Sequence, residues 1–252
     1  MSRTQLKHHW HPSPNFGPRQ AVVKPELIIL HYTGMKTADA ARDWLSNPQS
    51  GVSCHYLVDW AGAITQMVDE DLRAWHAGAG SWKGRGDINS LSIGIEVHNP
   101  GHELGYADFH MEQIDVVSAL CLDIASRHGI LPECILGHSD TAPLRKSDPG
   151  EKFPWNRLHL AGVGHWVEPL PVQEGKTLRL GDAGAEVAAL RSNLADYGYG
   201  IEPSGPFDIT TQAVVRAFQR HFRQAKVDGL ADPSTVETLQ RLLAALPDRR
   251  RT

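Results

Sequence analysis

Three short apolar runs constrain the fold of this chain more than any other feature. They are ELIILHYTG (26–34), SIGIEVHNP (92–100) and CILGH (134–138), and polar or turn-forming residues bound each of them. Apolar runs of this length predict buried β-strands. A fourth segment, CHYLVDWAGAITQMV (54–68), alternates about an Ala-Gly pair and predicts a β-hairpin. The sequence therefore predicts a sheet built from these segments.

Helical patterns separate the predicted strands. Residues 37–47 begin with a threonine suited to capping a helix and continue with alanine and leucine at helical spacing. Residues 107–129 place their apolar side chains on one face and stop at Gly129. This mixture predicts an α/β (α+β) fold, in which helices flank a central mixed β-sheet.

The C-terminal part has a different pattern. Residues 167–177 are rich in proline and charge and lack periodicity, which is typical of a linker. Three helical patterns follow, at 181–198, 208–222 and 232–246, the last with Asp232 as its cap and Pro233 in its first turn. Because 252 residues exceed a typical single domain, we expect two domains, 1–170 and 171–252, the second a small three-helix domain.

Composition excludes some partners and leaves the compartment open. A formal net charge of −4 provides no basic excess to follow a phosphate backbone, so we expect no nucleic acid partner. Residues 1–19 lack the apolar run of a signal peptide or transmembrane segment, and three cysteines suit a reducing compartment. These features favour the cytoplasm, whereas a removed leader would place the protein in the periplasm. The oligomeric state is left open.

Two histidines and a carboxylate form the strongest candidate site. His31 ends the first predicted strand, His138 ends the third, and the loop after His138 carries Asp148. Two imidazoles and one carboxylate are the ligand set of a catalytic zinc site that leaves a fourth position for water. Spacing alone does not bring His31 to Asp148, so ordinary hydrogen-bonding roles remain possible for both.

Two charged residues near this set have competing interpretations. Glu96 lies in an apolar strand, where a carboxylate is costly to bury unless it has a salt-bridge partner or a chemical task. Lys146 precedes Asp148 by two residues, so an extended loop directs both side chains to the same side, although a solvated lysine is also possible. The run HHWH at residues 8–11 is either a second metal site or a flexible terminal segment.

Ordered motifs over about residues 10–167 resemble the zinc-dependent type-2 N-acetylmuramoyl-L-alanine amidases. The matching segments are SPNFGPR, LIILHYTGM, SCHYLV, AWHAG, INSLSIGIEVHNPG, LGHSDTAPLRKSDPG and FPW. The tail, with LRLGDAGAEVAALRSNLADYGY, GPFDITTQAVVRAFQRHF and DGLADPSTVETLQ, resembles a three-helix peptidoglycan-binding module. The resemblance implies an amidase domain over 1–170 and a peptidoglycan-binding domain over 171–252.

The resemblance also implies residue roles and a reaction. Zn²⁺ ligands fall on His31, His138 and Asp148, the catalytic acid on Glu96 and the transition-state lysine on Lys146. Three residues match positions near the family's substrate cleft: Trp75, His76 and Asn99.

The implied substrate bond joins N-acetylmuramic acid to L-alanine in peptidoglycan or (anhydro-)muropeptides, during cell-wall turnover or recycling. Two alternatives are a muropeptide-sensing binding protein without turnover and an amidase acting on another amide. Related recognition proteins that only bind lack the complete ligand set, which this chain has.

Overall fold

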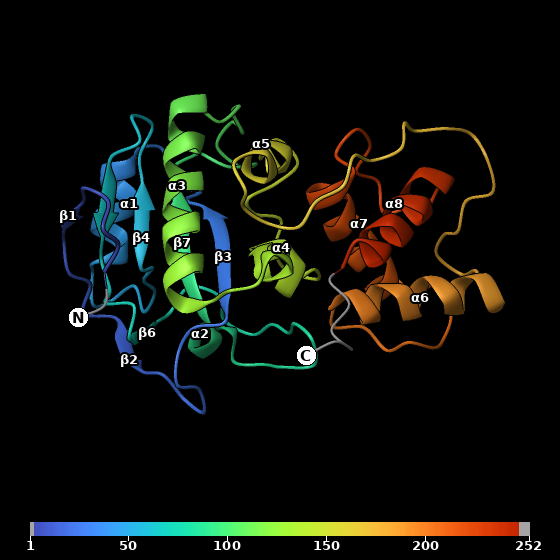
Figure 1. Cartoon of the computed structure of the whole chain (residues 1–252), viewed down its shortest axis with the longest axis horizontal. Coiled ribbons are helices and arrows are strands. Elements are labelled where there is room, and N and C mark those ends of the chain that lie inside the picture. Colours follow the sequence, from blue (N-terminus) through green and yellow to red (C-terminus); the bar gives the residue numbers. More distant parts are fainter. Residues whose placement is uncertain (1–2, 247–252) are drawn as a thin grey trace.

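A computed structural model describes residues 3–246 of the chain. Its first part is built on a six-stranded mixed sheet with the order β1-β5-β4-β7-β3-β8 (Figure 1). The strands are β1 (His9–Trp10), β3 (Leu27–Tyr32), β4 (Tyr56–Val58), β5 (Ile64–Gln66), β7 (Ser92–Val97) and β8 (Ile135–Gly137). A separate two-stranded sheet pairs β2 (Phe16–Pro18) with β6 (Leu72–Ala74).

The middle of the large sheet is parallel. Strand β3 lies between β7 and β8 and pairs in parallel with both, while β4 pairs in parallel with β7 and forms an antiparallel hairpin with β5. The register sets His31 of β3 directly opposite Glu96 of β7. Because paired residues in parallel strands point to the same side, this register places both side chains on one face of the sheet.

The long helices confirm the expected patterns. Helix α1 (Ala38–Leu45) is capped by Thr37, whose side chain accepts a hydrogen bond from the Ala40 amide. Helix α3 (Met111–His128) ends at Gly129, which adopts the left-handed conformation with φ of 68°. Figure 1 shows α3 lying across the sheet over β7 and β4. Short helices complete this part: α2 (Ile88–Leu91), η1 (Pro132–Cys134) and α5 (Trp155–Leu160).

One expected boundary is wrong. His138 does not end the third strand, because β8 stops at Gly137 and His138 begins the four-residue helix α4 (His138–Thr141). The Oδ2 atom of Asp140 accepts a hydrogen bond from the Gly137 amide at 2.8 Å, which turns the chain at this point. The side chain of His138 is thus held by a helical turn at the sheet edge.

The C-terminal part is helical, as expected. Helices α6 (Ala185–Tyr197), α7 (Ile209–Phe222) and α8 (Pro233–Ala244) pack together at the end of the molecule near α4 and α5 (Figure 1). Asp208 and Asp232 cap α7 and α8 with their side chains. The predicted α/β (α+β) fold with a C-terminal helical module is therefore confirmed, while the boundary near residue 170 stays a prediction.

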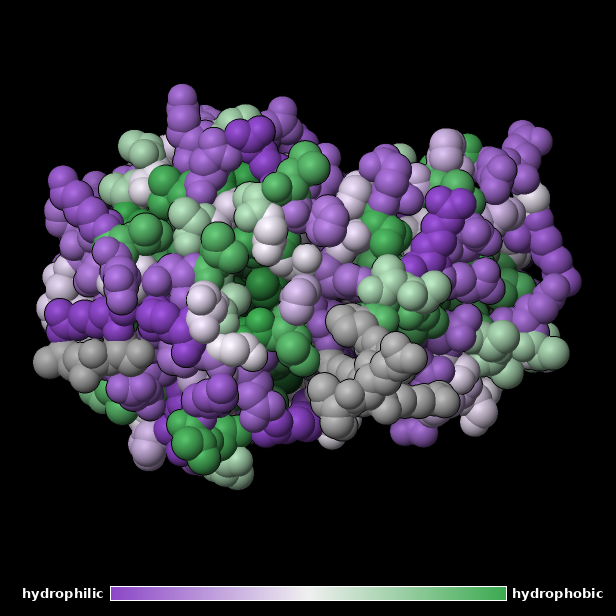
Figure 2. All heavy atoms as spheres, viewed as in Figure 1, coloured by the Kyte–Doolittle hydropathy of each residue, from purple (hydrophilic) through white to green (hydrophobic). Residues whose placement is uncertain are grey.

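The hydrophobic cores of the two parts are continuous. Trp82, which is 2 % exposed, inserts from the first part and its ring meets those of Tyr197 and Tyr199 edge-on. The face drawn in Figure 2 shows the two lobes meeting at a waist, with hydrophobic groups separated by hydrophilic ones. Between residues 3 and 246, no helix combines the length and apolar character that crossing a bilayer requires.

A buried ionic cluster ties α3 to the far end of the sheet. The Glu70 carboxylate is fully buried and accepts hydrogen bonds from Arg127 at 2.6 and 2.7 Å, from His128 at 2.7 Å and from the Tyr56 hydroxyl. Burial by itself raises the pKa of Glu70, but the hydrogen bonds from Arg127, His128 and Tyr56 outweigh it and hold the pKa well below its usual range. This carboxylate is therefore ionised and stabilises the folded state.

We expect Glu70→Gln to lower the free energy of unfolding by about 1.5–3 kcal/mol at pH 7, because it removes the buried charge that accepts hydrogen bonds from Arg127 and His128, while Arg127 keeps its ion pair with Asp123. The unfolded carboxyl has a pKa of about 4.3, so the stabilisation is complete above that pH and is lost as the pH falls through the lower folded pKa. Denaturant unfolding at pH 7 and pH 3 measures both effects. The exposed Glu112→Gln should change stability by less than about 0.5 kcal/mol, and equal stability of the two variants at pH 7 would contradict the assignment.

Candidate metal centre

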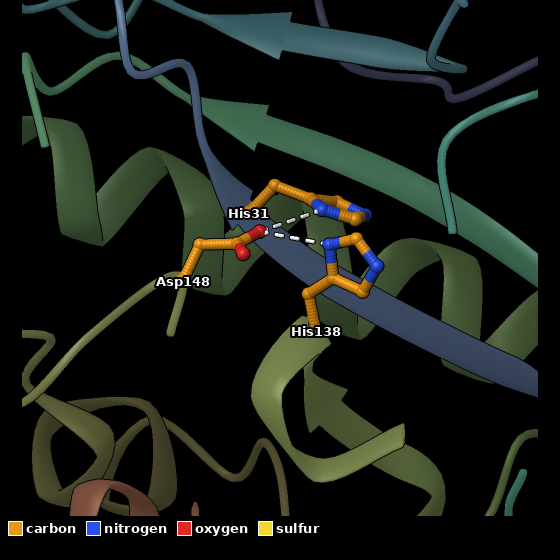
Figure 3. Close-up of side chains that lie close together, drawn as sticks. All are labelled: His31, His138 and Asp148. Carbon is orange, nitrogen blue, oxygen red and sulfur yellow. Dashed lines mark hydrogen bonds and ion pairs between the residues drawn. The ribbon is translucent and has the colours of Figure 1, made fainter. Parts of the chain in front are cut away.

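The fold brings together three side chains that are distant in sequence. His31 comes from β3, His138 from the first position of α4 and Asp148 from the following loop (Figure 3). The Oδ2 atom of Asp148 lies 2.9 Å from Nδ1 of His31 and 3.0 Å from Nδ1 of His138. All three are buried, and their possible ligand atoms lie within 4.8 Å of one another.

The protonation states of this cluster suit metal binding. Burial and the neighbouring His138 lower the pKa of His31 to about 4, so its imidazole is neutral at neutral pH. Burial alone raises the pKa of Asp148, but His138 and His31, as cations and N–H donors, outweigh it and hold the pKa well below its usual range; a metal ion that replaced their protons would act in the same direction. A neutral imidazole and an ionised carboxylate are the forms that coordinate metals.

A hydrogen-bond chain fixes which nitrogen of His31 faces Asp148. The Ser92 hydroxyl donates to the Ile88 carbonyl at 2.6 Å, so it accepts from Nε2 of His76 at 3.1 Å. Nδ1 of His76 is then an acceptor, and it accepts a hydrogen bond of 3.0 Å from the N–H group at Nε2 of His31. The lone pair of His31 is left on Nδ1, the atom beside Asp148.

His138 is oriented in the same way by a different partner. Its Nε2 lies 2.8 Å from the Ala77 carbonyl, which can only accept, so Nε2 carries the proton. In its neutral form, its Nδ1 lone pair also faces the Asp148 carboxylate. Three acceptors then converge with no hydrogen among them, an arrangement that a cation stabilises. The distances from Asp148 Oδ2 to the two Nδ1 atoms, 2.9 and 3.0 Å, are close to a zinc geometry. Ligand atoms about 2.0 Å from a tetrahedral zinc ion lie about 3.3 Å apart.

Glu96 lies on the same face of the sheet, opposite His31 in the strand register. Its Oε2 atom is buried and has no hydrogen-bond partner, so the alternative of a structural salt bridge finds no support there. Burial, followed by repulsion from Asp148, raises the pKa of Glu96 well above its ordinary value. A carboxyl group with one buried, unsatisfied oxygen beside a metal site is a candidate for proton transfer.

Lys146 lies in the wall of the same cavity as His31, Glu96, His138 and Asp148. Its backbone amide is bonded to the Ala142 carbonyl, which fixes the loop. Over the described part of the chain, its ammonium group has no hydrogen bond or ion pair with another residue. The ammonium is therefore available to a bound ligand.

The cavity at this site measures about 370 Å³. Its lining combines apolar and charged side chains. The apolar ones are Met35, Ala41, Trp44, Leu45 and Val52, and charged ones outside the metal cluster include Glu103, Arg145 and Lys146. The cavity can therefore contact both apolar and polar groups of a ligand.

The three predicted substrate-binding residues have different positions. His76 lines the cavity and also holds His31. Trp75 is not among the lining residues, and its backbone amide donates a hydrogen bond to the Ser53 hydroxyl at 2.8 Å. Asn99 is fully buried, away from the cavity, and its side chain bonds the Ala107 carbonyl and the Gly101 amide. The side chain of Asn99 thus shapes the loop that follows β7, and substrate binding by Trp75, His76 and Asn99 stays a prediction.

The histidine run at residues 8–11 does not form a comparable site. His8 bonds the Leu6 carbonyl, and His11 lies 3.4 Å from the Ser46 hydroxyl. Within residues 3–246, the only group of three or more potential metal ligands is His31, His138 and Asp148.

The fold and the site define a class of protein: a mixed α/β domain that carries a His-His-Asp metal-binding triad and a further carboxyl group, that of Glu96, in one cavity. Residues 21–151 match the family model of N-acetylmuramoyl-L-alanine amidases, and residues 183–246 match that of a peptidoglycan binding domain. The chain belongs to the N-acetylmuramoyl-L-alanine amidase family and is an enzyme of this kind.

Individual relatives agree with this assignment. The chain is 36 % identical over 233 residues to the amidase AmiD of Escherichia coli, covering 86 % of this chain and 82 % of AmiD. The structure of AmiD in complex with the substrate anhydro-N-acetylmuramic acid-L-Ala-D-gamma-Glu-L-Lys superimposes with a TM-score of 0.75 at 34 % identity, over 89 % of this chain and 91 % of that one. AmpDh3 of Pseudomonas aeruginosa gives a TM-score of 0.74 at 29 % identity, over 94 % and 96 % of the two chains.

Sequence reasoning named His76 only for the substrate cleft and missed the groups that orient the ligands. Ser92, His76 and the Ala77 carbonyl hold the far nitrogens of the two histidines. Gly94 was a usable signal, because a glycine inside a strand often marks a close approach of another group. A Cβ atom at Gly94 would lie 2.4 Å from the His76 ring, so only glycine leaves room for this ring to pack against β7 beside His31.

We expect His76→Leu to weaken metal binding by about 10- to 100-fold, because His31 loses the partner that fixes its tautomer. Ser92→Ala should act in the same direction with a smaller effect. Competition with a chromophoric chelator measures both. The buried Ser90 bonds the Gln20 amide instead, so Ser90→Ala should bind metal normally; equal loss in all three variants would count against the hydrogen-bond chain.

Proposed function

We propose that this chain uses Zn²⁺ to hydrolyse the amide bond between N-acetylmuramic acid and L-alanine in anhydro-muropeptides. The observation that carries the proposal is the convergence of three acceptor atoms, from His31, His138 and Asp148, beside Glu96 and Lys146 in one cavity. Two imidazoles and one carboxylate favour zinc over harder cations such as magnesium. A bound zinc ion would supply Lewis acidity, which lowers the pKa of water and polarises a carbonyl.

Glu96 is proposed as the group that moves the proton. Its carboxylate would accept a proton from the attacking water and pass it to the nitrogen of L-alanine as the amide bond breaks. Its position opposite His31 on the same sheet face supports this role. The raised pKa of Glu96 reflects burial and Asp148 without a cation, and a dication beside it would act in the opposite direction.

Lys146 is proposed to stabilise the negative charge that develops on the carbonyl oxygen. Its ammonium lines the cavity and is not paired with a carboxylate of the described chain. A fixed positive charge directed at a developing oxyanion contributes more in a partly dry cavity than in water.

The cavity and the relatives support a muropeptide substrate. The AmiD complex holds an anhydro-muramyl tripeptide as substrate, and AmpDh3 has been solved with an anhydromuramic pentapeptide. In this chain a cavity lined by both apolar and charged side chains would receive the substrate. We further propose that the helical module holds the wall polymer. The cytoplasmic location stays a prediction. In the cytoplasm the substrate would be soluble fragments, and in the periplasm it could be the intact wall.

Incubation of the zinc-loaded full chain with an anhydro-muramyl tripeptide should release the free tripeptide and the anhydro sugar acid. Mass spectrometry identifies both products. Removal of zinc by a chelator should abolish release, and added Zn²⁺ should restore it. Intact substrate with zinc-loaded protein would indicate a binding protein without turnover and would overturn the proposal.

Lys146→Met should lower turnover by about a hundred- to a thousandfold while zinc content stays near that of the unaltered chain, because one oxyanion donor is lost and no ligand is removed. Glu96→Gln should lower turnover at least as far and also retain zinc. Metal analysis and single-turnover rates separate the two quantities. Lys152 is also near the site loop but pairs with Asp108, so Lys152→Met is the matched control and should keep full activity.

A further inference from the structure

The short helix that carries His138 is organised by a buried carboxylate. Asp140 is fully buried, two residues after His138, and its Oδ2 atom holds the Gly137 amide at 2.8 Å. In the same turn, the Ser139 amide donates to the Asp148 carbonyl at 2.9 Å. The turn therefore links the backbones of two metal ligands, and Asp140 sets where it begins.

Two residues of the C-terminal module complete the surroundings of this carboxylate. The Tyr199 hydroxyl donates to Oδ1 of Asp140 at 2.8 Å, and Nδ1 of His221 lies 2.7 Å from Oδ2. Both side chains are only 3 % exposed. The hydrogen bonds that satisfy Asp140 thus come from the module as well as from its own turn.

The two donors are themselves held firmly. The His221 ring stacks between Trp155, at a centroid distance of 3.7 Å, and Phe222, at 3.8 Å. The Tyr199 ring packs edge-on against Trp82 at 5.1 Å. Neither donor can follow a displaced carboxylate without disturbing this aromatic packing.

An interface that only holds the two parts together would not need hydrogen bonds from Tyr199 and His221 to Asp140. Other bonds join the two parts without touching the metal turn, such as the one from Gln224 to the Phe153 carbonyl at 2.7 Å. At Asp140, by contrast, loss of the two donors would leave a buried carboxylate with the Gly137 amide as its remaining partner. Because α4 has only four residues, a shift of the Asp140 backbone that relieved this cost would displace His138 as well.

We propose that the C-terminal helical module positions the metal ligand His138, with Tyr199 and His221 acting as positioning residues through Asp140. The module is then a structural part of the metal centre in addition to any hold it has on the polymer. This inference rests on the proposed zinc site.

The test is the zinc affinity of the full chain carrying Tyr199→Phe together with His221→Leu. Chelator competition should show zinc binding weakened by about tenfold, the lower end of the range for lost ligand support, since these residues act one bond further out. The visible absorption of the Co²⁺-substituted protein should change as well, because it reports ligand geometry. Tyr199→Phe alone keeps His221 and should give a smaller loss in the same direction.

Two further variants distinguish positioning from general loosening. The single variant His221→Asn keeps an N–H donor beside the native Tyr199. Its zinc affinity should therefore be within about twofold of that of the unaltered chain. Tyr197→Phe removes the same atom from the same interface, but that hydroxyl lies 2.9 Å from His165 and does not contact Asp140. It should leave zinc affinity and the Co²⁺ spectrum unchanged while lowering thermal stability.

Unchanged zinc affinity and Co²⁺ spectrum in Tyr199→Phe and in the double variant would overturn the proposal. An equal loss in Tyr197→Phe would overturn it too, because interface stability would then account for the effect. Failure of the unaltered chain to bind zinc would instead refute the proposed metal site itself. Unfolding curves for every variant establish that folded proteins are compared, and the single Tyr199→Phe change decides the outcome if the double variant does not fold.

Discussion

The parallel pairing of β3 with β7 and β8 is the interaction on which the rest of the structure depends. It sets His31 opposite Glu96 and brings the end of β8 beside β3, so that the next turn can present His138. These strands contribute many buried apolar side chains, and burying them offsets the cost of placing ionisable groups at the strand ends. A slip of one residue in this register would turn His31 and Glu96 to opposite faces.

The metal centre shows how a fold can hold a set of groups that repel one another. His31, His138 and Asp148 direct acceptor atoms at one point, and Glu96 adds another carboxyl nearby. The outer nitrogens of His31 and His138 hydrogen-bond His76 and the Ala77 carbonyl, which keeps the inner lone pairs aligned. The repulsion that remains is what favours a cation. The buried Glu70 cluster differs, because its carboxylate is balanced by hydrogen bonds from Arg127 and His128.

The two parts of the chain form one structural unit at the point where chemistry takes place. Trp82 enters the helical module, and the module returns Tyr199 and His221 to Asp140 beside the metal turn. A proline-rich connection in sequence is therefore compatible with a fixed docking of the two parts, because the interface is made by residues far from that connection. The proposed coupling follows from this docking.

Much of the fold was predictable from local pattern. The strands, the two long helices of the first part and the three C-terminal helices were predicted, because apolar periodicity, capping residues and terminal glycines act over a few residues. The boundary at His138 was predicted wrongly, since the turn there is set by Asp140 and by donors from another part of the chain. Very short elements such as β1 and β2 carry too few residues to show a period.

For the site, the sequence by itself determined which chemical groups are present and, through the family resemblance, which of them to bring together. Only the tertiary structure decided how they meet. His31 and Asp148 are 117 positions apart, and the sequence between them carries no local signal of a 2.9 Å contact, because that contact depends on strand pairing and a loop return. The tautomer of His31 depends on Ser92 and His76, and the orientation of His138 on the Ala77 carbonyl. Hydrogen bonds between distant segments form only after packing, so their directions are set by the fold and not by spacing along the chain.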